Sequence, residues 1–182
     1  EVHLLTSGED GLVQMAEVLS GRSDVSALHI ISHGTAGSLS LGSAELTAGS
    51  MQGEHADELA VISAALSADA DILVYGCNFG AGDAGQEAVS LLAAITGADV
   101  AASTDDTGSA ALGGDWDLEQ RAGSIDAATL AAPEWDGLLT KTIINSTGGL
   151  LADGSDGIRI HVMTNGQYQI TYHGTNQVYA PF

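Results

Sequence analysis

Two short apolar runs, each leading to a chemically reactive side chain, constrain the fold of this chain more than any other feature. The first run, residues 27–32, leads to His33, and the second run, residues 72–75, leads through Gly76 to Cys77. Continuous apolar runs of this length predict strands that are buried on both faces of a sheet. Functional residues of α/β sheets gather beyond the carboxyl ends of parallel strands, so His33 and Cys77 are candidates for one site.

Segments with helical periodicity alternate with these strands. Apolar residues recur at helical spacing within residues 12–19, 59–66 and 88–95, and a third strand-like run covers residues 99–103. Strands that alternate with helices of this length predict parallel β-α-β units. We therefore expect an α/β fold, built as a three-layer α/β/α sandwich with a mainly parallel sheet. Shorter strands are predicted at Val2–Leu5 and Asp115–Glu119.

The pattern changes towards the C-terminus, where helical periodicity is lost. Residues 158–162 and 168–172 alternate apolar and polar side chains, and Asn165-Gly166 lies between them. Asn-Gly between two alternating runs is a strong signal for a β-hairpin. We therefore expect an α/β domain over residues 1–139 and a β-rich appendage over residues 140–182.

The charge of the chain excludes some partners and favours others. Its 24 acidic and 4 basic residues give a net charge of −20, which repels phosphate backbones and makes nucleic acid a poor partner. No run approaches the ~18 apolar residues of a membrane span, so no membrane insertion is expected. Such acidity suits a secreted protein and divalent-cation binding. Asp153 and Asp156 resemble part of a calcium loop, although the bidentate glutamate of an EF-hand is missing.

Cys77 and His33 have the chemistry of a nucleophile and its proton partner. A cysteine thiolate attacks a carbonyl carbon, and a histidine protonates the leaving amine. The backbone amides of Gly34 and Cys77 would hold the oxyanion that forms in this reaction. The alternative is purely structural, because a lone cysteine at a strand end is usually a small buried apolar residue. A lone histidine after a strand is likewise usually an ordinary loop residue.

The two strand ends resemble those of the caspase-like (clan CD) cysteine peptidases. In that group one hydrophobic strand ends at His-Gly and a later one ends at a small residue and Cys, as at His33-Gly34 and Gly76-Cys77. His33 precedes Cys77 by 44 residues, close to the roughly 50 residues found in caspases, whose signature around the cysteine is not matched. The resemblance implies a caspase-like fold and a cysteine endopeptidase with a Cys/His dyad that requires no cofactor.

A closer resemblance is to an uncharacterised bacterial domain family at the N-terminus of very large, repeat-rich surface or adhesin-like proteins. It covers roughly residues 2–138 and is carried by four stretches: His29–Gly34, Tyr75–Asn78, Thr96–Gly108 and Gly113–Glu119. It implies a secreted or cell-surface protein of bacteria, and it implies proteolysis only through the His33/Cys77 pair. Because the proteins of that family are large, we expect such activity to process the chain itself or other surface proteins. That family usually has a further strand upstream, and the chain begins at Glu1 with no methionine, so we expect a piece of a longer protein.

The substrate preference is predicted from the residues after the next strand. In caspase-like folds such residues often line the pocket beside the cysteine, and here they are Ser103, Thr104, Asp105 and Asp106. An acidic pocket would favour Arg or Lys before the scissile bond, which makes Lys141 a candidate processing site. The alternative is that the two aspartates only form a turn, for which Asp is well suited.

A second functional class stays open on the sequence alone. The domain would then be a non-catalytic interaction or anchoring module of a large bacterial surface protein that keeps the peptidase fold. The peptidase hypothesis requires a protein or peptide substrate as partner, which includes the chain itself. The anchoring hypothesis requires no reactive thiol at Cys77.

Overall fold

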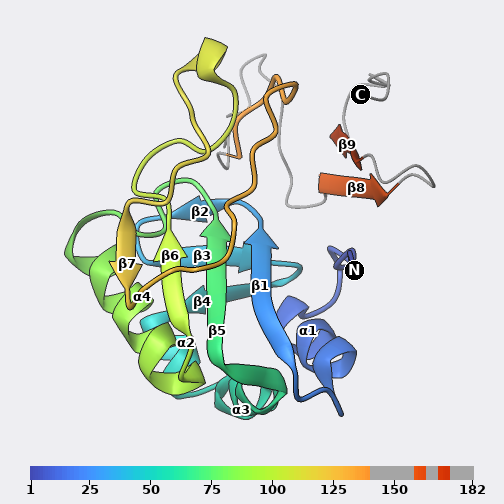
Figure 1. Ribbon diagram of the computed structural model, residues 1–182, viewed down its shortest axis with the longest axis vertical. Coiled ribbons are helices and arrows are strands. Elements are labelled where there is room, and N and C mark those ends of the chain that lie inside the picture. Colours follow the sequence, from blue (N-terminus) through green and yellow to red (C-terminus); the bar gives the residue numbers. More distant parts are fainter. Residues whose placement is uncertain (140–157, 163–167, 173–182) are drawn as a thin grey trace.

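The computed structural model describes residues 1–139, 158–162 and 168–172 (Figure 1). The helices are α1 (Gly11–Leu19), α2 (Ala48–Gln52), α3 (Ala56–Ala65), α4 (Gly82–Thr96) and the short 3-10 helix η1 (Ala110–Leu112). The strands are β1 (Val25–Ile31), β2 (Gly34–Thr35), β3 (Ser38–Leu41), β4 (Ala44–Thr47), β5 (Leu66–Tyr75), β6 (Asp99–Ala102), β7 (Gln120–Ala122), β8 (Ile158–Val162) and β9 (Tyr168–Tyr172).

The central sheet has four strands in the order β1-β5-β6-β7. β1, β5 and β6 run parallel, and β7 is antiparallel to β6. The register between β1 and β5 is constant from Ala27↔Asp71 to Ile31↔Tyr75. The residues just beyond both strands therefore leave the sheet at the same level.

Helices and a small hairpin sheet cover one face of the central sheet. The larger hydrophobic core contains buried side chains of α1, α3, α4, β1, β5 and β6, together with side chains of the small sheet β2-β3-β4. α1 begins where the Asp10 side chain accepts hydrogen bonds from the Leu12 and Val13 N–H groups. α4 ends at Gly97, whose left-handed φ of 73° is typical of a helix C-terminus.

The opposite face carries a smaller core that contains no helical side chain among the described residues. Its buried members are Leu73, Tyr75, Cys77, Ala101, Leu118, Trp135 and Leu139. Residues 123–139, which we call the covering segment, cross this face as an irregular chain after β7, drawn in orange in Figure 1. The second outer layer of the described fold is therefore made of loops.

Two side chains of β5 hold the covering segment on the sheet. Asp71 is only 3% exposed, and its carboxylate accepts hydrogen bonds from the N–H groups of Asp126 at 3.0 Å and Ala127 at 2.7 Å. The Tyr75 hydroxyl accepts the Leu130 N–H at 2.7 Å. The segment thus gains backbone partners from side chains, because no neighbouring strand supplies them here.

The α/β class, the mainly parallel sheet and the C-terminal hairpin predicted from the sequence are confirmed. β8 and β9 pair antiparallel from Ile158↔Tyr172 to Val162↔Tyr168. The strands predicted at Val2–Leu5 and Asp115–Glu119 are wrong. Val2 and Leu4 are exposed, and only Leu5 packs against the larger core. Leu118 and Trp116 of the second segment pack in the smaller core outside any strand.

Among the described residues, none of the helices combines the length and the hydropathy that crossing a membrane requires.

Candidate active site

Cys77 lies in a tight turn between the end of β5 and the start of α4. The Phe79 N–H closes the turn by donating to the Gly76 carbonyl at 3.0 Å. Asn78 has a positive φ of 61°, a backbone conformation that asparagine adopts more readily than most side chains. The Asn78 side-chain amide also donates to the Asp106 carboxylate at 3.2 Å. The residue after the cysteine is therefore held in an unusual conformation by contacts from the next loop.

His33 leaves β1 beside this turn. The Ser32 N–H donates to the Tyr75 carbonyl at 3.1 Å, which continues the parallel ladder one residue beyond β1. His33 and Cys77 each lie two residues beyond the last pair of this register, Ile31↔Tyr75. A Cβ atom at Gly34 would stand 2.9 Å from the Cys77 carbonyl oxygen, so glycine is needed for the two loops to approach this closely.

Thr107 holds the thiol of Cys77 from two directions. Its N–H donates to Cys77 Sγ at 3.2 Å, and the thiol lies 3.7 Å from its carbonyl oxygen. Thr107 is buried, and its hydroxyl has no hydrogen-bond partner within the part of the chain that the structure describes. Cys77 itself is 0% exposed. The thiol is thus enclosed between the turn, the loop after β6 and the covering segment.

The enclosure disfavours the thiolate. Burial raises the pKa of Cys77 from its ordinary value of 9.0 to about 11, and the charge of Asp106 adds to the increase. Backbone amides of Thr107, Cys77 and Leu139 act in the opposite direction. In this closed arrangement Cys77 keeps its proton at neutral pH, which is the state expected of a resting thiol rather than an exposed nucleophile.

Leu139, the last residue of the covering segment, reaches both His33 and the surroundings of Cys77. Its carbonyl oxygen lies 2.9 Å from His33 Nδ1. Its N–H donates to the Thr107 carbonyl at 2.9 Å and lies near enough to Cys77 to lower the pKa of the thiol. Its side chain is 1% exposed within the smaller core. A peptide carbonyl of the chain itself therefore occupies the neighbourhood of the two candidate catalytic residues.

The two amides predicted to hold an oxyanion have different surroundings. The backbone N–H of Cys77 lies on the thiol side of the turn, where it lowers the pKa of its own side chain. Gly34 begins β2 and packs against the Cys77 carbonyl. The position of the Cys77 amide fits the predicted role, whereas Gly34 has a packing role that is evident without a substrate.

The four predicted pocket residues follow β6 and reach different partners. Ser103 is buried, and its hydroxyl donates to the Asp105 carbonyl at 3.0 Å. The N–H and hydroxyl of Thr104 donate to the Glu119 carboxylate at 2.8 and 3.1 Å. Asp105 is exposed, and Asp106 is half-buried against the turn described above. Asp106 contacts the cysteine turn through its side chain, whereas Asp105 does so through its backbone carbonyl, which accepts the Asn78 N–H at 2.7 Å.

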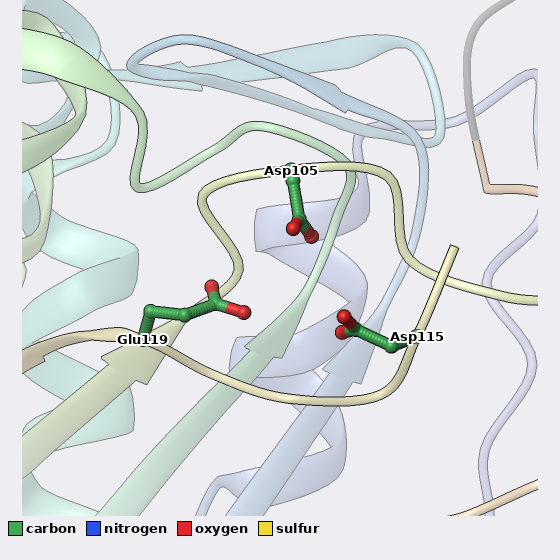
Figure 2. A group of neighbouring side chains, drawn as sticks. All are labelled: Asp105, Asp115 and Glu119. Atoms are coloured by element: carbon green, nitrogen blue, oxygen red, sulfur yellow. The ribbon is translucent and has the colours of Figure 1, made fainter. Parts of the chain in front are cut away.

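An acidic group lies on the outside of this loop. Asp105, Asp115 and Glu119 each offer a carboxylate oxygen within 4.8 Å of the others, and Figure 2 shows the three side chains turned towards a common space. Partial burial raises the pKa of Asp105, and the charges of Glu119 and Asp115 contribute to the same shift. Because exposed acidic groups of this kind are common without an ion, the group alone is no evidence for calcium.

Three residues named from the sequence lie outside the described residues. They are the candidate processing site Lys141 and the candidate calcium ligands Asp153 and Asp156. Conversely, two residues that enclose the thiol, Thr107 and Leu139, were not predicted from the sequence. Thr107 directly follows the predicted pocket residues, which was the one local signal for it. The position of Leu139 depends on the path of the covering segment and has no local signal.

The chain has a match among known protein families. The family described as "Domain of unknown function (DUF4347)" matches residues 1–139. The chain belongs to this family. The match confirms the resemblance to an uncharacterised domain family, and it includes His33, Cys77 and the whole covering segment. Neither a curated protein nor a solved structure matches the chain. The description of the family names no activity, so the function has to be argued from the site.

Proposed function

We propose that the protein is a cysteine endopeptidase in which Cys77 is the nucleophile and His33 carries the proton. This assignment agrees with the proposed relationship to the caspase-like peptidases. It needs no metal or organic cofactor, because the thiol and the imidazole supply the nucleophile and the proton transfer.

One observation carries the proposal. His33 and Cys77 each follow by two residues the last pair of the parallel register, Ile31↔Tyr75, and a peptide carbonyl, that of Leu139, lies 2.9 Å from His33 Nδ1. A peptide carbonyl is the group that a cysteine peptidase attacks, and this one is within hydrogen-bond distance of the candidate acid. Cys77 and Leu139 also share the smaller core. Nucleophile, proton partner and carbonyl therefore come from three separate parts of the chain and meet at one end of the sheet.

The described form supports a closed, resting enzyme. Cys77 is fully buried, and its pKa of about 11 keeps the thiol protonated at pH 7. An external substrate reaches the thiol only after the covering segment moves away from the smaller core. Activity on other proteins is therefore expected to depend on displacement of residues 123–139.

The class of substrate follows from charge and from the expected setting of the protein. We propose that it acts on proteins, either its own chain or other secreted or surface proteins of bacteria. The net charge of −20 disfavours nucleic acid as a partner. The preference for a basic residue predicted from the sequence rests on the charges of Asp105 and Asp106 alone. A calcium requirement rests on the acidic composition alone.

A different function is favoured by the same burial that closes the site. A cysteine with 0% exposure and a raised pKa also suits a structural residue of a non-catalytic interaction or anchoring module. In that case His33 serves only to fasten the end of the covering segment through Leu139. The two functions predict different effects of removing the thiol and the imidazole.

A protease assay separates the two. We would incubate the 182-residue chain with denatured, carboxymethylated casein and a reducing agent, with and without calcium, and measure new peptides by mass spectrometry. The proposal predicts peptide release by the wild type and a loss of at least about a hundredfold in Cys77→Ala and His33→Ala. Equal release by the wild type and Cys77→Ala would contradict it.

The matched control is His29→Gln. His29 lies on β1, the strand that leads to His33. Its ring stacks on Tyr75, with ring centroids 6.0 Å apart and 8° between the ring planes. It is part of the packed sheet and not of the dyad, so this variant should keep most of the casein cleavage. An equal loss in His29→Gln and His33→Ala would assign the effect to folding instead of catalysis.

A further inference from the structure

We propose that the peptide bond between Leu139 and Thr140 is the substrate this site cleaves in its own chain. The inference rests on the proposed peptidase function and adds to it the scissile bond and the preferred residue, a leucine. It differs from the expectation of cleavage after Lys141, which came from the acidic residues beside the site. The geometry around the carbonyl of Leu139 carries it.

Residues 137–139 lie along the loop after β6 in the way that an extended peptide adds to an exposed edge. The Ser109 N–H donates to the Gly137 carbonyl at 2.8 Å, and the Leu139 N–H donates to the Thr107 carbonyl at 2.9 Å. An antiparallel bridge links Gly108 and Leu138 between these two bonds. Such strand addition is a general mode of peptide recognition, in which backbone bonds hold the peptide and pockets take alternate side chains.

Glycine at position 108 makes this close pairing sterically allowed. Gly108 has a φ of 138°, and a Cβ atom there would collide with the Gly137 carbonyl oxygen. The loop after β6 is therefore shaped to receive a backbone at this position. The pairing places Leu139 directly at the end of the bound stretch.

The side chain of Leu139 fills an apolar site. It is 1% exposed and packs in the smaller core with Cys77, Tyr75 and Trp135. Asp105, by contrast, is exposed on the outside of the loop. The residue that precedes the proposed scissile bond is thus selected by apolar burial, and a leucine fits where a lysine would bury an unpaired charge.

The carbonyl of Leu139 is held beside His33, and its amide lies beside Cys77. His33 Nδ1 lies 2.9 Å from its oxygen, and with the proton on Nδ1 this contact polarises the carbonyl. The Leu139 amide lies close enough to the thiol of Cys77 to lower its pKa. The anchors at Asp71 and Tyr75 keep the covering segment in this register. Intramolecular positioning of this kind replaces the binding step that an external substrate needs.

The reaction balances without a cofactor. Cys77 Sγ forms a bond to the carbonyl carbon of Leu139, and the bond from that carbon to the nitrogen of Thr140 breaks. The thiol proton passes through His33 to the leaving amine, which becomes the new N-terminus at Thr140. Solvent water then hydrolyses the thioester, leaving a carboxylate on Leu139 and returning a proton to the thiol.

The test is the intact mass of the 182-residue chain over time, in reducing buffer across neutral to alkaline pH, with and without calcium. Denatured, carboxymethylated casein is added to a parallel sample as an external substrate. The expected result is a pair of products that end at Leu139 and begin at Thr140, formed by the wild type and absent from Cys77→Ala and Cys77→Ser. Circular dichroism of the variants verifies that each is folded.

A leucine pair tests the specificity. Leu139→Ala should slow the cut at least about tenfold, because one buried apolar side chain contributes that much to selection. Leu138→Ala should slow it less, since the Leu138 side chain is only half-buried. An equal effect of the two variants would overturn the assignment of Leu139 as the selected residue.

The possible outcomes separate this inference from the proposed function. A Cys77-dependent cut after Lys141, or at any bond other than Leu139–Thr140, overturns the inference and leaves the peptidase function standing. An intact chain together with Cys77-dependent cleavage of casein does the same. An intact chain and intact casein in every condition overturn both. A cut at Leu139–Thr140 that persists in both Cys77 variants overturns the inference, and it overturns the proposed function as well when casein cleavage also persists in those variants.

Discussion

At the scale of single residues, Cys77 combines the position of a nucleophile with the environment of a core residue. It follows the end of β5, as His33 follows the end of the neighbouring strand β1, yet it is fully buried and has a pKa of about 11. Both facts hold in the closed form, because residues 107 and 139 enclose the thiol. The position of Cys77 gives it the chemistry proposed for a nucleophile. Its burial determines when a substrate can reach the thiol.

The raised pKa predicts slow alkylation of the folded protein. At pH 7, a thiol with a pKa of about 11 in place of 9.0 has about a hundredfold less thiolate. Reaction with iodoacetamide should therefore be at least that much slower than for a free cysteine, and it should accelerate as the pH rises towards 11. Mass spectrometry measures the rate. Alkylation of folded protein at the rate of denatured protein would contradict the buried thiol.

The same shift predicts a loss of stability in alkali. The folded state favours the neutral thiol, so this contribution to stability is complete below pH 9 and is lost as the pH rises from 9 to 11. Cys77→Ala lacks the thiol and should lose less stability over that range. Urea unfolding at several pH values measures the difference, and parallel curves for the two proteins would count against it.

Asn78 provides a second prediction at this scale. Its positive φ suits Asn or Gly, so Asn78→Ala should lower the free energy of unfolding by about 1–2 kcal/mol. Asn78→Gly keeps the backbone conformation and loses only the bond to Asp106, so it should cost less. Chemical unfolding measures both. A larger loss in the glycine variant would show that the side-chain bond, and not the backbone, dominates.

At the scale of elements, the covering segment depends on a few anchors. Asp71→Ala leaves two backbone N–H groups without their buried acceptor and should lower the free energy of unfolding by about 2–3 kcal/mol. It should also speed the alkylation of Cys77, because the segment that encloses the thiol is released. Asp71→Asn keeps one acceptor oxygen and is the matched control. If Asp71→Ala lowered the stability but did not speed the alkylation of Cys77, the hydrogen bonds to Asp71 would not be what keeps the thiol enclosed.

The elements of the larger core were predictable from the sequence. Helical periodicity predicts α1 and α4, and apolar runs predict β1, β5 and β6. Packing in the larger core then stabilises these elements. The register between β1 and β5 could not be read directly, although the matching endings of the two runs anticipated it. The strand predicted at Val2–Leu5 is absent because four mostly apolar residues are too few to require a strand partner.

The covering segment could not be predicted for a physical reason. It has no period, because its backbone groups bond to the side chains of Asp71 and Tyr75, which are far away in the sequence. The same holds for Leu139, whose role depends on where that segment ends. His33 and Cys77 could be named as candidates because strand ends carry a local sequence pattern. Thr107 and Leu139, which enclose the thiol, could not be named because they carry no such pattern.

At the scale of the whole molecule, a net charge of −20 spread over the chain weakens the compact state through self-repulsion. The melting temperature should therefore rise as NaCl is increased from about 10 mM to about 200 mM, since the screening length falls several-fold. Asp105→Asn removes one member of the acidic group and should raise the melting temperature at low salt more than at high salt. A melting temperature that does not change with salt would show that repulsion between the acidic residues does not destabilise the fold.

The proposed peptidase, closed by its own chain, requires Cys77 and His33 to act as one unit. The most direct measurement is labelling by a short peptidyl ketone that ends in leucine, followed by mass mapping of the labelled residue. We predict label on Cys77 in the wild type, faster labelling in Asp71→Ala, and almost none in His33→Ala. Equal labelling of Cys77 in the wild type and His33→Ala would show that the two residues do not form a catalytic pair.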